Sequence, residues 1–159
     1  MNKRTLLDAV IAKLEAELAA LTQAALATHA EATDEENKAE DKYDTRGLEA
    51  SYLALGQSKA AEEAAQAVAQ FRALPLRDFT DADPIGLGAL VTLETQGRRT
   101  HYFIGPRAGG TEISHEGRTV LVITPSSPLG RQLVGRRSGD AFTLDQGGRK
   151  SAASLAVVG

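Results

Sequence analysis

The chain has 159 residues, of which 18 are basic and 21 acidic; hydrophobic residues make up 42%, aromatic residues 4%, and cysteine is absent. The lack of cysteine excludes a disulfide-stapled domain, a thiolate metal site and a cysteine nucleophile. No apolar run approaches the ~20 residues that span a bilayer, and the first 18 residues carry charges too often for a signal peptide, so we expect a cytoplasmic protein of one or two small domains.

The net charge of −3 is unevenly distributed along the chain. Residues 1–75 hold 8 basic and 13 acidic residues, whereas residues 76–159 hold 10 basic and 8 acidic ones. Alanine and glutamate are frequent in the first part; glycine, arginine and β-branched residues are frequent in the second. This change of composition near Pro75 predicts two domains of different type, 1–75 and 76–159.

The first part has the pattern of an antiparallel coiled-coil hairpin. Residues 3–32 contain neither glycine nor proline, and residues 44–74 form a second helical stretch that ends at Pro75. Gly47 and Gly56 weaken this stretch by about 1 kcal/mol each relative to alanine. Apolar or small residues recur at alternating spacings of four and three, the seam pattern of a coiled coil. The first seam comprises Leu7, Ile11, Leu14, Leu18, Leu21, Ala25 and Thr28, and the second Ala50, Ala54, Gln57, Ala61, Ala64, Val68 and Phe71.

The predicted tip of the hairpin, residues 31–44, holds seven carboxylates and two lysines. In one interpretation this is a soluble, capped helix start, because Thr33 and Glu36 fit a capping box and helix dipoles favour acids in the first turn. In the other, the carboxylates bind a hard divalent cation such as Mg²⁺ or complete a metal site in a partner. Glu36, Glu40 and Asp44 would then share one helix face.

The second part reads as a small α+β domain on an antiparallel sheet. After a linker at 74–84, strand candidates at 89–94 and 100–104 flank a turn at 96–99, and candidates at 112–114 and 119–123 flank a turn at 115–118. Ser126 or Ser127 could cap a short helix that has Pro128 in its first turn and closes at Gly135. A last strand pair is expected at 141–144 and 152–158.

Motifs of common enzymes are absent from the sequence: no P-loop, dinucleotide GxGxxG, HExxH or GxSxG occurs. His29, His101 and His115 are scattered, as surface or half-buried histidines are, rather than grouped as bases or metal ligands. The remaining basic residues of interest, Arg131, Arg136 and Arg137, could contact a phosphate or an acidic protein surface, or could simply suit a helix end.

The run Ile123–Asp140 resembles the pattern TPxSPLGxALLGxxxGD of the bacterial Gre transcription factors. The stretch 36–43 is similar to a diverged form of the acidic tip of these factors. The resemblance covers nearly the whole chain and implies an N-terminal coiled-coil hairpin followed by an FKBP-like C-terminal domain. It also implies that the domain binds RNA polymerase, with Ser127, Pro128, Leu129, Gly130 and Arg131 as the residues carried over.

The resemblance further implies a mechanism. Gre factors insert the hairpin into the secondary channel of RNA polymerase, where tip carboxylates help to hold the second Mg²⁺ and orient a water, so that the polymerase hydrolyses backtracked RNA. This agrees with two-metal catalysis. The chain would then be an accessory factor without an enzyme activity, stable metal or cofactor of its own, sharing Mg²⁺ with the polymerase. We expect a monomer whose partners are RNA polymerase and, indirectly, backtracked RNA, with no membrane.

The register of the tip is open. The Gre pattern has Asp, two residues, then Glu-Asn-Ala-Glu-Tyr; matching on Glu36 places Thr33 at the Asp position, and matching on Tyr43 places Ala39 at the Glu position. The candidate tip acids are therefore Asp34, Glu35, Glu36, Glu40, Asp41 and Asp44.

Three alternative functions remain: a channel-binding inhibitor related to Rnk-type or anti-Gre regulators, a general protein-interaction module, and a peptidyl-prolyl isomerase. The few aromatic residues of the second part disfavour the isomerase.

Overall fold

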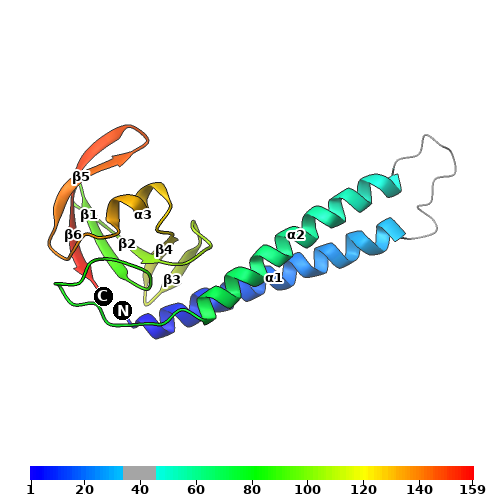
Figure 1. Cartoon of the computed structure of the whole chain (residues 1–159), viewed down its shortest axis with the longest axis horizontal. Helices are drawn as coiled ribbons and strands as arrows, with labels where there is room; N and C mark the ends of the chain where they lie inside the picture. The colour runs from blue at the N-terminus through cyan, green and yellow to red at the C-terminus, as the bar shows by residue number, and fades with distance from the viewer. Residues whose placement is uncertain (34–45) are drawn as a thin grey trace. The chain divides into compact units, whose positions relative to one another are not determined.

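The computed structural model describes residues 1–33 and 46–159 (Figure 1). The chain forms two compact units: residues 12–69 make up the first, and residues 1–11 together with 70–159 make up the second. We call them the hairpin unit and the globular unit. They differ from the predicted division at residue 75, because both ends of the hairpin, residues 1–11 and 70–75, belong to the globular unit.

Two long helices make up the hairpin, α1 (Lys3–Thr33) and α2 (Arg46–Arg72). Every predicted seam residue whose side chain is described is buried or half-buried, whereas most other positions between residues 12 and 31 are exposed. Asn2 starts α1, since its Oδ1 accepts hydrogen bonds from the backbone N–H of Arg4 (2.9 Å) and Thr5 (3.3 Å). The 4-3 spacing therefore identified the packed face of each helix.

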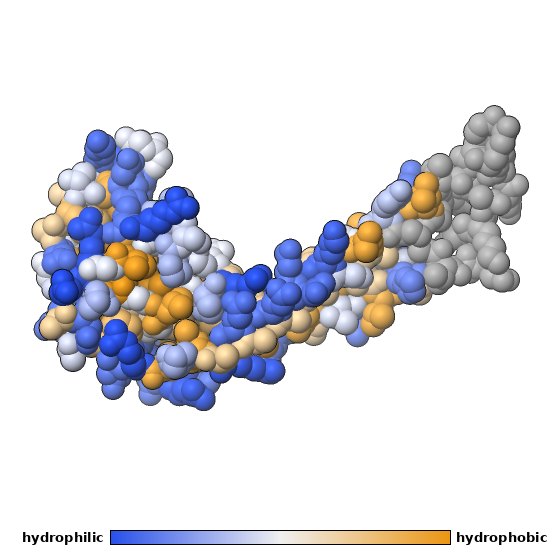
Figure 2. All heavy atoms as spheres, in the orientation of Figure 1, coloured by the Kyte–Doolittle hydropathy of each residue, from blue (hydrophilic) through white to orange (hydrophobic). Residues whose placement is uncertain are grey.

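The hairpin also carries apolar side chains on its outer surface. Leu48, Tyr52 and Leu55 of α2 are 56%, 68% and 58% exposed, and their spacing of four and three places them on one helix face. Leu53 and, on α1, Leu26 are exposed as well, and Figure 2 shows orange side chains reaching the surface of the hairpin. We call Leu48, Tyr52 and Leu55 the apolar stripe. It lies outside the seam, so packing between α1 and α2 does not explain it.

The globular unit is built on a six-stranded sheet of order β3-β4-β2-β1-β6-β5. Its strands are β1 (Leu90–Thr95), β2 (Arg98–Ile104), β3 (Glu112–His115), β4 (Arg118–Ile123), β5 (Ala141–Gln146) and β6 (Arg149–Val158). The sheet is mixed, and the predicted antiparallel sheet is wrong at one pair, because β2 runs parallel to β4. Strands β2 and β4 are each the second strand of a hairpin. The chain crosses over between the two hairpins, so the four-residue β3 lies at the edge of the sheet.

The predicted hairpin turns are confirmed but are shorter than the four residues expected. Each loop has two residues with positive φ, which is the geometry that follows the twist of an antiparallel pair. The φ values are 50° and 75° at Gln96 and Gly97, and 49° and 73° at Glu116 and Gly117. A third loop, at Gly147 and Gly148, joins β5 to β6 with φ of 63° and 88°. The strands consequently extend one to three residues further into the turns than predicted.

Both faces of the sheet are apolar. One face forms a core with the short helix α3 (Pro128–Leu133); this core includes Val91, Tyr102, Leu133 and Leu155. Alternation places Phe103, Val120 and Val122 on the opposite face, where they are fully buried. The ring of Phe71, at the end of α2, packs there beside Val122 and Gly105.

The FKBP-like description of this unit stays a prediction. No helix in the described parts of the chain has the length and apolar character to cross a membrane.

Candidate functional site

The first predicted site, the acidic tip, lies outside the described residues. This applies to all six candidate acids, Asp34, Glu35, Glu36, Glu40, Asp41 and Asp44. Within residues 1–33 and 46–159, no three histidine or carboxylate side chains come together as a metal-binding group. Assignment of a metal ligand role to the tip acids therefore stays a prediction.

The second predicted site is the loop that leads into α3, and Ser127 is its N-cap. The Ser127 Oγ accepts a hydrogen bond from the Gly130 N–H at 3.0 Å and donates one to the Thr124 carbonyl at 2.7 Å. The Ser127 backbone is extended, with φ −65° and ψ 157°, as an N-cap residue requires. Of the two serines that the sequence offered as caps, the structure selects Ser127.

Gly130 allows α3 to lie directly against this loop. A Cβ at position 130 would lie 1.8 Å from the carbonyl oxygen of Thr124 and 2.9 Å from the Ser127 Oγ. No side chain fits in that space. Ser127 and Gly130 therefore shape the loop and have no free group to offer a partner.

The exposed side of α3 carries the residues that remain available for contacts. Pro128 and Arg131 are exposed, and their spacing of three places them on one side of the helix; Val134, the C-cap residue that follows it, is 39% exposed. Leu129 instead packs against the core of the sheet. We call Pro128, Arg131 and Val134 the α3 face. It combines one cation with two apolar groups, a composition that suits a protein surface better than a small polar ligand.

The other two arginines of the basic stretch have partners within the unit. Arg136 stacks on Phe142, with its guanidinium carbon 3.9 Å from the ring centroid, and its Nε donates to the Gln132 carbonyl at 2.6 Å. Arg137 donates through its Nε to the carbonyl of Ala82 at 2.8 Å. The Arg136 contact agrees with the helix-end interpretation, because Gln132 lies in the last turn of α3, whereas neither interpretation predicted the contact of Arg137 with Ala82.

Gln132 was not singled out by sequence reasoning, although it ties α3 to the sheet. Its Nε2 donates to the carbonyl of Asp145 at 2.7 Å, and its Oε1 accepts from the N–H of the same residue at 2.8 Å. The amide thus forms a two-point contact with β5. Nothing in the local sequence could indicate it, because the partner lies thirteen residues away on a strand.

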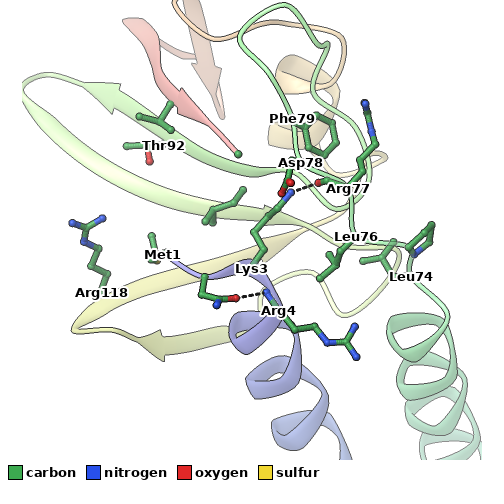
Figure 3. A pocket seen from close by; sticks show the side chains of 15 residues that line it. Met1, Lys3, Arg4, Leu74, Leu76, Arg77, Asp78, Phe79, Thr92 and Arg118 are labelled. Carbon is green, nitrogen blue, oxygen red and sulfur yellow. Dashed lines mark hydrogen bonds between the residues drawn. The ribbon is translucent and has the colours of Figure 1, made fainter.

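A cavity of about 840 Å³ lies beside the first turn of α1 within the globular unit (Figure 3). We call it the N-terminal cavity. Its walls come from residues 1–4, from the segment 74–79 and from strands β1, β4 and β6. Figure 3 shows Lys3 directed toward Arg77 and Asp78, with Arg118 and Thr92 on the other side of the helix start.

Lys3 is half-buried in the wall of this cavity. Its ammonium donates hydrogen bonds to the carbonyls of Arg77 and Gly88, and lies 4.9 Å from the ring centroid of Phe79. The Arg77 guanidinium covers the same ring at 4.0 Å. Burial lowers the pKa of Lys3, an effect that nearby Asp78 opposes. The cation is therefore held largely by neutral carbonyls and an aromatic ring.

The start of α1 is also fastened to the β3–β4 hairpin. Glu116 accepts from the N–H of Asn2 at 3.2 Å, and this hydrogen bond is the main reason why the pKa of Glu116 is lowered. Thr5 Oγ1 lies 3.1 Å from His115 Nε2. These polar contacts fix the first turn of the helix, and with it Lys3, relative to the sheet.

A smaller hollow of about 370 Å³ shares Arg118 with the N-terminal cavity and includes His101. His101 is half-buried, and its Nδ1 lies 3.0 Å from Thr92 Oγ1. Burial, followed by the charge of Arg118, lowers the pKa of His101.

Sequence reasoning missed the basic lining of the N-terminal cavity, because its cations are separated by up to 115 positions in the chain. The one available signal was the pair of cations, Lys3 and Arg4, at the start of a helix.

No protein-family model and no curated protein matches the chain. Solved structures do match along nearly its full length. GreA factor homolog 1 (Gfh1) of Thermus thermophilus is 19% identical, covers 94% of this chain and 94% of its own, and has a TM-score of 0.38. A structure of the transcription factor Gfh1 is 22% identical, covers 94% and 93%, and has a TM-score of 0.40. The Gfh1 of Thermus aquaticus is 22% identical, covers 95% and 94%, and also has a TM-score of 0.40.

Proposed function

We propose that this chain is a Gre-like transcription factor that binds RNA polymerase, inserts its hairpin into the secondary channel and modulates elongation. The observation that carries the proposal is the run 123–140. This loop needs a particular residue at four positions, and all four match the Gre pattern. Ser127 caps the helix, Gly130 allows the close approach, and Gly135 and Gly139 have positive φ of 88° and 84°. The run differs from that pattern at Gln132 and Val134.

The hairpin supports the same proposal. Its seam is closed by buried and half-buried residues, so α1 and α2 form a rod that needs no further partner to cover the seam. The apolar stripe nevertheless leaves three large side chains more than half exposed. Exposed apolar groups in a row are typical of a surface that contacts another protein. A rod with such a stripe suits insertion into a protein channel better than a spacer surrounded by water.

The tip acids would act inside the polymerase. In this proposal they supply ligands for the second Mg²⁺ of the polymerase active site and so promote hydrolysis of backtracked RNA. The chain itself is then an accessory factor and not an enzyme. A second candidate, inhibition of the polymerase by channel occupancy, is favoured by the tip register, because neither alignment places acids at both positions of the Gre pattern.

We expect that adding the protein to a stalled, backtracked RNA polymerase complex shortens the transcript from its 3′ end. A variant with Asp34, Glu35 and Glu36 changed to alanine should lose this activity while still binding the polymerase, because the tip supplies ligands and not docking contacts. Transcript length on a denaturing gel is the measurement. Slower elongation without cleavage would establish the inhibitor instead. A protein that neither binds polymerase nor changes transcription would refute both.

We expect Arg131→Glu to weaken polymerase binding by roughly tenfold, because it reverses the one charge on the α3 face of the proposed docking site. Binding is measured by fluorescence anisotropy of the labelled protein. Arg149→Glu is the matched control, since Arg149 is also an exposed arginine and lies at the start of β6. Equal affinities of the two variants would show that the α3 face is not the docking surface. Thermal unfolding checks that both variants fold.

A further inference from the structure

The N-terminal cavity has the size and lining of a binding site for a small molecule. Its volume of about 840 Å³ lies within the range of roughly 300–1,000 Å³ that is usual for ligand pockets. Inorganic phosphate would leave most of it empty. Apolar side chains in the lining include Leu76, Leu90 and Val157, and Val157 is 56% exposed although it belongs to a central strand pair. The apolar lining could therefore cover the body of an organic ligand.

The charge of the lining is strongly positive. Four basic side chains face one carboxylate, that of Asp78; the four are Lys3, Arg4, Arg77 and Arg118. Arg4 and Arg77 approach carboxylates that lie outside the lining, Asp8 at 3.7 Å and Asp83 at 3.5 Å, and both contacts are at the exposed surface. Screening by water makes such contacts weak. The cavity therefore retains an excess of positive charge.

Lys3 and Arg118 are each near a carboxylate, Asp78 and Glu116 respectively, but neither forms an ion pair with it within the described part of the chain. Lys3 donates to two carbonyls, which satisfy its N–H groups without neutralising its charge. The Arg118 side chain forms no hydrogen bond or ion pair within the described part of the chain, so its planar fork of N–H donors is available at the rim. Such a fork binds phosphate oxygens in pairs. The two cations come from α1 and β4, which the contacts of Asn2 and Thr5 with the β3–β4 hairpin hold together.

The position of Lys3 and Arg4 adds a further reason. They occupy the first turn of α1, which contains no acidic residue. The dipole of a helix favours anions at this end and disfavours cations. Natural proteins keep such locally unfavourable residues mainly at functional sites. An anion in the cavity would offset both the dipole and the side-chain charges.

We propose that the N-terminal cavity binds a phosphate-bearing small molecule larger than free phosphate, whose phosphate is held by basic side chains of the lining, Arg118 at the rim among them, and whose body lies on apolar side chains such as Leu76, Leu90 and Val157. A group with two negative charges suits the excess of cations better than a single carboxylate. This proposal concerns the globular unit by itself and is independent of polymerase binding.

Isothermal titration calorimetry of the full chain tests the proposal with four probes: AMP, glucose 6-phosphate, inorganic phosphate and citrate. We expect AMP, glucose 6-phosphate or both to bind at one site, at least tenfold more tightly than inorganic phosphate or citrate. If both bind, the site recognises the phosphate that the two molecules share. If only one binds, the organic part of that molecule determines specificity. Tight binding of citrate would overturn the choice of phosphate. Failure of AMP and glucose 6-phosphate to bind below millimolar concentration would overturn the proposal.

Two variants locate the site. Arg118→Ala and Lys3→Gln should each weaken binding of the preferred probe by roughly tenfold, the usual loss for one charged contact. Arg149→Ala is the control, because Arg149 lines a different hollow at the β5–β6 end of the sheet. Equal losses in Arg149→Ala and Arg118→Ala would indicate non-specific attraction and overturn the assignment. Arg118 is exposed, so its variant retains the fold, which thermal unfolding verifies.

Discussion

Gly130→Ala is expected to lower the free energy of unfolding of the globular unit by about 3 kcal/mol or more. The added methyl group would lie 1.8 Å from the carbonyl oxygen of Thr124 and 2.8 Å from its carbon. Because the obstacle is backbone, relief requires that α3 move away from the loop, which would break the hydrogen bond from the Gly130 N–H to Ser127. Urea denaturation followed by circular dichroism measures the change.

Gly56→Ala is the matched control for this prediction. Gly56 lies within α2, and a Cβ built there has no heavy atom within 4 Å outside its own helix neighbourhood. We expect the variant to stabilise the helix by about 1 kcal/mol, because alanine has the higher helix propensity. The two substitutions are chemically identical and differ only in the space around them. A Gly130→Ala protein as stable as the wild type would contradict the described packing of α3.

Phe71→Ala is expected to lower the free energy of unfolding by about 3–5 kcal/mol. The Phe71 side chain is fully buried at the end of α2. Its ring packs against the second face of the sheet, beside Val122 and in contact with the backbone at Gly105. Its removal leaves a cavity where the end of the helix joins the sheet. The measurement is the same urea denaturation, supplemented by limited proteolysis at the segment 73–84.

The contact between Phe71 and Gly105 can be tested separately. A Cβ at position 105 would lie 2.7 Å from Cζ of Phe71 and 2.9 Å from Cγ1 of Val122. Gly105→Ala should therefore destabilise the wild type and cost less in a Phe71→Leu background, where the side chain is shorter. A double-mutant cycle measures this coupling. Additive effects of the two substitutions would show that the ring does not occupy this position.

Much of the fold follows from local signals in the sequence. The 4-3 spacing of small and apolar residues identified the seam of the hairpin, because a helix brings such positions onto one face. Alternating residues around Gln96-Gly97 and Glu116-Gly117 identified two hairpins, because only a few residue types accept positive φ at both turn positions. The run 123–140 indicated the capped helix α3. Each of these signals lies within a short stretch of chain.

Other features depended on residues that are far apart in sequence. The parallel pairing of β2 with β4 was missed, because a crossover between two hairpins leaves no local pattern. The domain boundary differed for a related reason, since Leu7 and Ile11 belong to the heptad pattern of the hairpin but lie in the globular unit. The five residues carried over as polymerase contacts are of three kinds: Ser127 and Gly130 shape the loop, Leu129 packs against the core, and Pro128 and Arg131 are exposed.

The sequence by itself determined the helices, the turns and the resemblance to Gre factors, because periodicity, φ preference and motif spacing are properties of neighbouring residues. Only the tertiary structure decided which charges act together. Lys3 and Arg118 are 115 positions apart, and they line one cavity because α1 is held against the β3–β4 hairpin by Asn2 and Thr5. Charge interactions depend on distance in space and on burial. The positive charge of this cavity could therefore not be located by counting charges along the chain.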